Sequence, residues 1–197
     1  MVPGTLVATL SSRADHATSI RAAAVLFVTV LTAAAAQVSV PLPFTPVPFT
    51  LQPMVVLVGG AALGARLGLV SQLLYLAAGA AGLPVFAASA ILPPGAARLL
   101  GPTAGYLFAF PLAAFATGWL AERGFGRRYM TSVAAMAAGL AIIFACGTLW
   151  LSFLAPQLGL RGAAAAGLIP FVPADSLKVF VAAAVLPAAW RITRVRP

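Results

Sequence analysis

Charged residues divide this chain into long uncharged stretches, and that pattern limits the folds that are open to it. The stretches Ala22–Ala65, Leu67–Ala97, Leu99–Ala121 and Tyr129–Leu160 contain no Asp, Glu, Lys or Arg. A helix needs roughly 17–25 mainly apolar residues to cross the hydrocarbon core of a bilayer. Each stretch is long enough for at least one such helix, so the sequence predicts an all-α integral membrane protein.

The composition agrees with this prediction and argues against several classes of protein. Of the 197 residues, 62% are hydrophobic and only 8% are charged, whereas an ordinary soluble domain is about 45–50% apolar and about 25% charged. Little polar surface is left to cover a water-soluble globule. The net charge of +9 suggests nucleic-acid binding in other proteins, but here we expect basic loops beside a membrane and no nucleic-acid partner.

Prolines and glycines subdivide the uncharged stretches into separate helices. Several prolines between Pro41 and Pro53 end the first helix, Gly64–Gly68 is typical of a tight turn, and a Gly/Pro-rich connection covers Gly82–Pro102. The predicted spans are about Ile20–Val38, Leu51–Leu63, a third that continues to about Ala81, Thr103–Ala121, Thr131–Leu154 and Pro173–Trp190. The second and third spans are short, at roughly 13–15 residues each, which fits tilted helices or helices that only partly cross.

These six predicted helices form a single domain with both termini in the cytoplasm. Residues 1–19 are expected to be a cytoplasmic tail, residues 20–190 the six-helix core, and residues 191–197 a basic cytoplasmic tail. In this orientation Arg98 and Arg161 lie outside, and the positive-inside rule is satisfied by the remaining arginines of the loops and tails. Those inside are Arg13, Arg21, Arg66, Arg123, Arg127, Arg128, Arg191, Arg194 and Arg196.

Asp175 and Lys178 stand out because both are charged and both lie in the sixth predicted span. Their i, i+3 spacing places them on one face of a helix, near its outer end. Ionisable residues within a span usually face the protein interior or a water-filled cavity, which favours a binding role. Two structural interpretations remain open. In one the lysine reaches out to the interface, and in the other the residues form an ion pair at the helix N-terminus.

The first outer loop, Pro41–Pro53, is a second unusual feature. It contains no charge and many prolines, and its polar side chains are Thr45, Thr50 and Gln52. Such a loop is stiff and apolar, unlike a solvated connector. Its composition fits equally well a loop that lies on lipid headgroups and a lid that closes over a pocket.

Further polar side chains are predicted at the same outer end. Arg98 precedes the motif Gly101–Tyr106 at the mouth of the fourth span, where it contacts lipid headgroups or meets a ligand carboxylate with two hydrogen bonds. Tyr75 and Tyr106 either stack on a ligand or anchor their helices. Together with Asp175 and Lys178, these residues predict a compact outward-facing site for a small polar ligand.

The residues needed for catalysis are sparse. The single histidine, His16, lies in the N-terminal tail, and the acidic residues Asp15, Glu122 and Asp175 are far apart in the chain. The single cysteine, Cys146, has no neighbouring histidine to act as its base, and Lys178 is not preceded by the glycines of a phosphate-binding loop. We therefore expect no enzyme, no metal site and no cofactor. If the protein transports a ligand uphill, the energy comes from a partner or an ion gradient.

Several motifs of the sequence together resemble those of a known family. The resemblance rests on ordered motifs that cover most of residues 40–180, namely Pro46–Gln52, Leu63–Gly68 followed by Tyr75, Gly79–Ala87, Gly101–Tyr106 and Pro173–Lys178. These motifs are similar to those of the BioY family, the biotin-binding membrane subunits (S components) of energy-coupling factor (ECF) transporters. The family fold is six transmembrane helices with an outward-facing vitamin pocket, in agreement with the topology derived from the charges.

The resemblance implies that biotin is the transported ligand and that the protein lies in a bacterial cytoplasmic membrane. It places the first outer loop over the pocket and implies a set of binding residues: Asp175, Lys178, Arg98, Tyr106, Gly105, Gln52, Thr50 and Tyr75. Asp175 would accept a hydrogen bond from a ureido N–H, and Lys178 would donate to the ligand or hold Asp175 charged. Arg98 would pair with the carboxylate of biotin, while the tyrosines and Gln52 would line its rings.

The resemblance also implies partners, with one departure. S components of this kind usually work with a transmembrane T component and two ATPases, and they present an Ala-x-x-x-Ala motif on the first helix. Here the alanines are not paired in that way: Ala22, Ala23 and Ala24 are followed four residues later by Leu26, Phe27 and Val28, and the nearest small pairs are Thr29/Ala33 and Thr32/Ala36. This departure leaves open a protein that acts alone, or as a homo-oligomer.

Two other functions remain open from the sequence. One is an S component for another small vitamin on the same fold. The other is a structural membrane protein in which Asp175 and Lys178 only stabilise packing. The run Thr45–Gln52 and the Asp-x-x-Lys pair favour biotin over the first.

Overall fold

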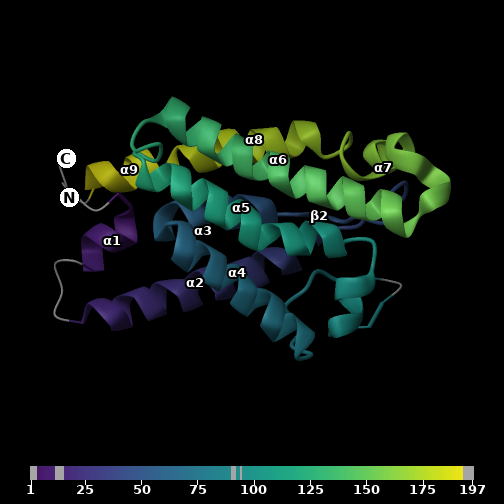
Figure 1. The fold of residues 1–197 in the computed structure, drawn as a ribbon, viewed down its shortest axis with the longest axis horizontal. Helices are drawn as coiled ribbons and strands as arrows, with labels where there is room; N and C mark the ends of the chain where they lie inside the picture. The colour runs from purple at the N-terminus through teal and green to yellow at the C-terminus, as the bar shows by residue number, and fades with distance from the viewer. Residues whose placement is uncertain (1–3, 12–15, 90–91, 94, 193–197) are drawn as a thin grey trace.

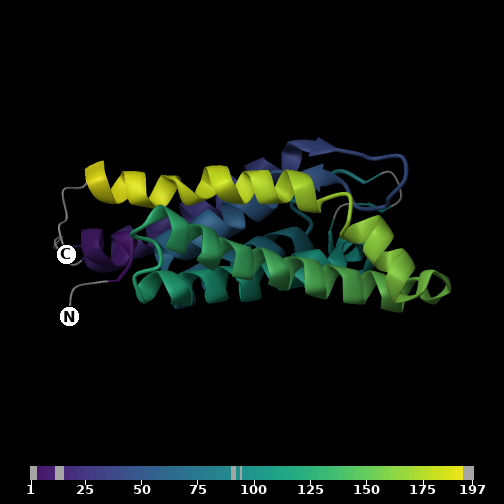
Figure 2. The same cartoon turned by 90° about the horizontal axis from the view of Figure 1, so that it is seen from above.

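The computed structural model describes residues 4–11, 16–89, 92–93 and 95–192. Parts of the predicted tails, including Arg13, Asp15, Arg194 and Arg196, lie outside these ranges. The described residues form a bundle of helices with a short hairpin beside it (Figures 1 and 2). The helices are α1 (Leu6–Ser11), α2 (Ala17–Gln37), α3 (Gln52–Leu63), α4 (Ala65–Ala80), α5 (Ala104–Glu122), α6 (Tyr129–Leu154), α7 (Gly159–Gly167), α8 (Val172–Ala183) and α9 (Val185–Ile192).

Shorter elements join these helices. Strands β1 (Ser39–Val40) and β2 (Phe49–Thr50) pair antiparallel, and 3-10 turns lie at Ala96–Leu100 (η1) and Pro156–Leu158 (η2). None of these elements, nor α1 or α7, was predicted from the sequence. A two-residue strand and a one- or two-turn helix carry too little periodicity to be recognised in a proline- and alanine-rich chain.

The helical fold agrees with the prediction of an all-α membrane protein. Within the described residues, four segments are long and apolar enough to cross a membrane: Ala17–Gln37, Ala104–Glu122, Tyr129–Leu154 and Val172–Arg191. The second and third predicted spans correspond to α3 and α4, which are shorter apolar helices. The total of six spans and the cytoplasmic position of both termini remain predictions.

The turn between α3 and α4 is shorter than predicted. Only Gly64, with φ of 90°, lies between the two helices, and α4 begins directly at Ala65. The free N–H of Ala65 donates to Glu122 Oε1 at 2.9 Å, so the first turn of α4 is capped from the far end of α5. An N-terminal backbone donor that is satisfied in this way needs no longer loop.

The sixth predicted helix is interrupted near its C-terminal end. The helix α8 stops at Ala183, and α9 continues from Val185 in nearly the same direction (Figure 2). Pro187 lacks a backbone N–H, and in a continuous helix its ring would clash with the carbonyl four residues earlier, that of Ala183. The break therefore follows from a proline inside an otherwise apolar helix.

Helix α5 is the central element of the bundle and packs against α3, α4 and α6. Small residues face these neighbours: Ala109, Ala113, Ala114 and Thr117 are completely buried. A Cβ atom added at Gly60 of α3 would overlap the backbone of Ala114, and one added at Gly118 would overlap Gly64 and Ala65. These small side chains allow the helix backbones to approach closely, as in many membrane proteins.

We expect Gly118→Ala to destabilise the protein, because the new methyl group meets backbone atoms that cannot rotate away. A loss of about 1–3 kcal/mol is expected from overpacking of this kind. Thermal unfolding of the detergent-purified protein, followed by the loss of monodisperse material, measures the change. The matched control is Gly162→Ala in α7, where the added methyl meets only the side chain of Leu158. Equal midpoints for the two variants would contradict the packing argument.

Candidate ligand-binding site

A cavity of about 270 Å³ lies between the hairpin loop, the first turns of α5 and α8, and the middle of α6. Much of its wall is apolar, with the side chains of Phe86, Leu107, Phe110, Ile143, Phe144 and Phe171. Its polar wall includes Thr45, Thr50, Gln52, Ser89, Thr103, Arg98, Tyr106 and Asp175. A concave apolar site with a few converging polar groups is the usual form of a small-molecule pocket.

The first loop covers one side of this cavity. The hairpin pairs Ser39 with Thr50 and Val40 with Phe49, so the chain between the strands folds back on itself. Pro41, Pro46 and Pro48 of this loop lie on the cavity wall, together with the buried side chain of Val47. The loop therefore takes the position of a lid, which is one of the two arrangements that its composition allowed.

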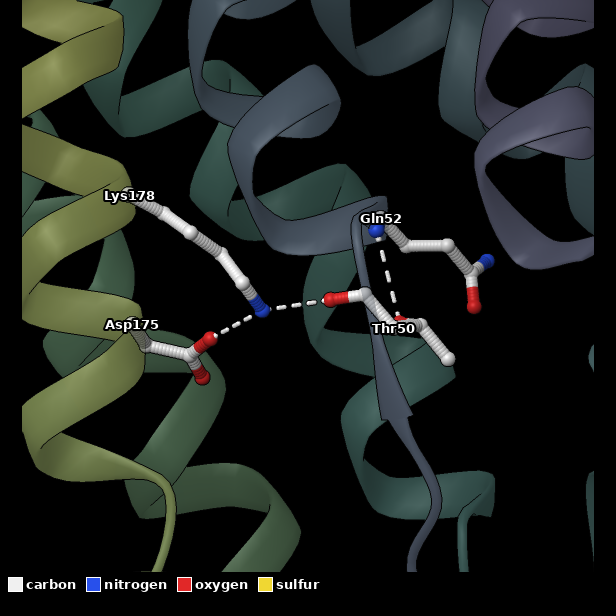
Figure 3. A network of polar contacts seen from close by, with 4 residues as sticks. All are labelled: Thr50, Gln52, Asp175 and Lys178. Carbon is white, nitrogen blue, oxygen red and sulfur yellow. Dashed lines mark hydrogen bonds and ion pairs between the residues drawn. The ribbon is translucent and has the colours of Figure 1, made fainter. Parts of the chain in front are cut away.

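Lys178 joins α8 to this loop (Figure 3). Its ammonium group lies 2.6 Å from Asp175 Oδ1 and donates to the backbone carbonyl of Thr50 at 2.5 Å. The same group lies over the ring of Phe49, 3.5 Å from the ring centroid, in a favourable cation–π position. Because these contacts hold the ammonium inside the protein, the interpretation in which Lys178 reaches out to the membrane interface is wrong.

The members of this pair have different positions relative to the cavity. Asp175 is buried and forms part of the wall, whereas Lys178 is not among the lining residues. Figure 3 shows the ammonium bonded to one of the two carboxylate oxygens. Asp175 is thus placed to contact a ligand, while Lys178 compensates its charge and fixes the adjacent loop.

Gln52 and Tyr75 form a second polar connection at the base of the loop. Gln52 Nε2 donates to the Tyr75 hydroxyl at 2.7 Å, and this hydroxyl donates to the carbonyl of Val85 at 3.2 Å. The Tyr75 ring is completely buried and packs edge-on against Phe86, with 5.4 Å between the ring centroids. Gln52 lines the cavity and Tyr75 does not. Tyr75 therefore supports the cavity wall instead of stacking on a ligand.

Tyr106 and Gly105 also differ in their positions. Tyr106 lines the cavity, and its hydroxyl donates to the carbonyl of Gly167 at 2.7 Å, which fixes the end of α7. Gly105 lies on the side of α5 that faces α6, where an added Cβ would overlap Trp150 and the carbonyl of Cys146. It is absent from the cavity wall, and its small size serves the packing of α5 on α6.

Arg98 brings a positive charge to the wall of the cavity. Its Nε donates to the carbonyl of Pro93 and its Nη1 to the carbonyl of Ala87, both at 2.9 Å. Burial lowers the pKa of this guanidinium from its ordinary value. Over the described ranges the one ion pair is that of Lys178 and Asp175, so the charge of Arg98 has no carboxylate partner there. The lining side chains of this cavity and their ion pair carry a net positive charge, which suits an anionic group of a ligand.

The phenylalanine side chains of the wall, and the hydroxyl side chains of Ser89 and Thr103, were not predicted from the sequence. Phe86 and Phe171 each lie near a proline, in segments that were predicted to connect two spans. Thr103 lies at the start of a predicted span. A phenylalanine in an apolar chain is not distinguishable by sequence from one that faces lipid. Only the structure shows that these particular rings point to one cavity.

Comparison with known proteins decides the family. The family model described as BioY family matches residues 9–195. The chain belongs to the BioY family. It is 41% identical over 153 residues to a probable biotin transporter BioY of Pyrococcus horikoshii, covering 77% of this chain and 85% of that protein. It is 42% identical over 155 residues to a biotin transporter BioY of Thermotoga maritima, covering 79% of this chain and 86% of that protein.

A solved structure shares the fold. The crystal structure of the S-component for biotin from an ECF-type ABC transporter superposes with a TM-score of 0.80 at 24% sequence identity. The match covers 93% of this chain and 95% of that chain. The helical architecture predicted from the uncharged stretches is therefore that of a BioY protein, and the chain is a membrane protein of a transporter family that crosses the bilayer more than once.

We expect Tyr75→Phe to destabilise the cavity wall while leaving the packed ring in place. The change removes the acceptor of Gln52 and the donor to Val85, and a buried polar group without a partner costs about 1–3 kcal/mol. Thermal unfolding in detergent measures this loss. The control is Tyr129→Phe, which removes the hydroxyl of an exposed tyrosine that donates to Phe180 at 3.1 Å. A Tyr75→Phe protein as stable as the control would contradict the supporting role.

Proposed function

We propose that this protein binds biotin in the cavity beneath the hairpin loop and mediates its uptake across the membrane. The observation that carries the proposal is the close similarity to proteins named biotin transporters over more than three quarters of the chain. The chemistry of the cavity supports it. An apolar wall, a carboxylate and an uncompensated guanidinium are present together at one site.

Biotin has three parts, and the cavity offers a complement to each. The ureido ring carries N–H groups, and the carboxylate of Asp175 accepts a hydrogen bond from one of them. The thioether ring is apolar and suits the phenylalanine side chains of the wall, including Phe86, Phe110 and Phe171. The carboxylate of the tail suits Arg98, whose charge has no partner in the described part of the chain. Buried polar groups that a wrong ligand leaves unpaired disfavour that ligand strongly, which gives selectivity.

The remaining predicted site residues act around this ligand. Thr50 and Gln52 contribute polar atoms from the loop side of the cavity, and Tyr106 contributes from α5. The other three predicted residues do not line the cavity. Lys178 holds the loop, Tyr75 supports the wall, and Gly105 allows α5 to pack closely on α6. In this proposal the ion pair of Asp175 and Lys178 serves binding as well as packing, which distinguishes it from a purely structural pair.

The proposed transport unit is an S component that works with a T component and ATPase subunits. No phosphate-binding loop occurs in the sequence, so hydrolysis of ATP belongs to a partner. The apolar residues Leu26, Phe27 and Val30 are exposed on α2, where S components usually present small residues to the T component. The proposed arrangement has six spans, with α3 and α4 as short crossing helices, and places both termini in the cytoplasm of a bacterial cell.

Equilibrium binding of labelled biotin to the detergent-purified protein tests the proposed ligand. We expect saturable binding that unlabelled biotin displaces and that thiamin and riboflavin do not. Asp175→Ala and Lys178→Ala should each weaken binding at least ten-fold. The first removes the acceptor of the ureido N–H, and a hydrogen bond to a charged group contributes about 1.5–3 kcal/mol; the second leaves Asp175 without its counter-charge and releases the loop. Arg161→Ala, an exposed arginine on α7, is the control and should bind normally.

Two results would overturn this function. Absence of biotin binding by well-folded, monodisperse protein would exclude biotin as the ligand. Normal binding by both Asp175→Ala and Lys178→Ala would place the site elsewhere, and displacement by thiamin or riboflavin would indicate a different vitamin.

Cysteine labelling in intact cells tests the proposed orientation. In a Cys146→Ala background, a cysteine introduced by Arg161→Cys should react with a membrane-impermeant maleimide, because α7 lies at the outer end in this topology. A cysteine introduced by Arg128→Cys, between α5 and α6, should react only after the cells are opened. Both side chains are exposed, so lack of access inside the protein does not confuse the result. The reverse pattern would invert the orientation.

A further inference from the structure

A second cavity lies at the end of the bundle remote from the hairpin. It measures about 640 Å³ and is bordered by α1, α2, α4 and α5. Figure 1 shows α1, the start of α2 and the last turns of α5 together at this end, next to α9. Its lining residues are distinct from those of the proposed biotin site, so its occupant is independent of the ligand of the first cavity.

Arginines from two helices reach the border of this cavity. Arg21 comes from α2, and its Nε donates to Ser11 Oγ of α1 at 3.1 Å, which fixes the direction of the side chain. Arg66 comes from the first turn of α4 and is exposed. Arg123 lies close by, with its guanidinium 3.3 Å from the ring centroid of Trp119 on the cavity wall.

One carboxylate, that of Glu122, also borders the cavity. Its Oε1 accepts from the backbone N–H of Ala65 at 2.9 Å, so it serves as the cap of α4. Among the described residues no ion pair joins Glu122 to Arg21 or Arg66. The rim of the cavity therefore has an excess of positive charge, formed by groups whose charges are not neutralised within the described protein.

The remaining wall is apolar. Leu63 and Leu67 lie beside Phe115 and Trp119 on this wall, and the two aromatic side chains are partly exposed. Both belong to α5, a segment apolar enough to cross the membrane, and Trp119 lies three residues before its end. Tryptophan prefers the boundary between the headgroups and the acyl chains. The cavity thus has a cationic rim at the level of the headgroups and an apolar wall toward the hydrocarbon core.

We propose that this cavity binds an anionic phospholipid. The lipid phosphate lies between Arg21 and Arg66, and an acyl chain follows the wall formed by Leu67 and Phe115. Basic pockets between transmembrane helices are typical sites for anionic lipid headgroups. A free phosphate ion shares the charge of the headgroup but makes no use of the apolar wall, so the lipid is the occupant that the geometry favours.

Fluorescence quenching by brominated lipids tests the proposal at the cavity itself. A full-length protein with Trp150→Phe and Trp190→Phe retains Trp119 as its single tryptophan. It is reconstituted in mixtures of phosphatidylglycerol and phosphatidylcholine in which either one is brominated. We expect phosphatidylglycerol to be preferred at Trp119. Arg21→Gln combined with Arg66→Gln should lower this preference, by roughly five-fold per arginine, and Arg161→Gln, at the other end of the bundle, should leave it unchanged.

Other outcomes would overturn the proposal. An equal loss of preference in the Arg161→Gln protein would reduce the effect to the general attraction of a basic protein for anionic lipid. Restoration of Trp119 fluorescence by millimolar inorganic phosphate would identify a site for a free anion. Native mass spectrometry of the protein with all three tryptophans provides a second measurement. Unchanged retention of phosphatidylglycerol by Arg21→Gln/Arg66→Gln would contradict the site even if the tryptophan variants fail to fold.

Discussion

The contact of one ammonium group with two parts of the chain determines how the ligand cavity is closed. Lys178 lies on α8, and its three partners are Asp175 on the same helix and Thr50 and Phe49 on the hairpin. A charged group at this depth requires compensation, and the carboxylate and the backbone carbonyl provide it. Because part of that compensation comes from the loop, a stable position for the lysine is also a stable position for the lid.

Close packing of the helices makes this arrangement possible. The helices around the cavity approach closely, α3 and α5 at Gly60 and Ala114, and α5 and α6 at Gly105. In lipid the hydrophobic effect provides little force between apolar helices, so dense van der Waals contact has to hold them together. The large apolar side chains are then free to face either the membrane, as on α2, or the cavity, as with Phe110 and Phe171.

Much of the helical fold and part of the site were predictable from the sequence, for a physical reason. Long uncharged stretches that end at arginines or prolines indicate which segments lie in an apolar environment. The predicted spans therefore match α2 to α6 and the segment formed by α8 and α9 to within a few residues, whereas α1 and α7 were not predicted. Asp175 was recognisable because a charge within a span requires an explanation. The role of Lys178 as a link to Thr50 was not, since the partner is a backbone carbonyl 128 residues away. Tyr75 and Tyr106 had the same sequence signal, yet only Tyr106 faces the cavity.

The few charged side chains near the hairpin cavity have separate roles. Around the hairpin cavity, the charge of Asp175 is already balanced by Lys178, so a ligand that bonds to Asp175 need not displace the ammonium from Thr50. In the proposed complex a ligand anion pairs instead with Arg98, which the carbonyls of Ala87 and Pro93 hold in place without neutralising it. The ureido and carboxylate ends of biotin would thus be recognised by groups on α8 and η1, on separate parts of the wall. In this proposal Lys178 holds the lid closed, and Arg98 neutralises the ligand carboxylate.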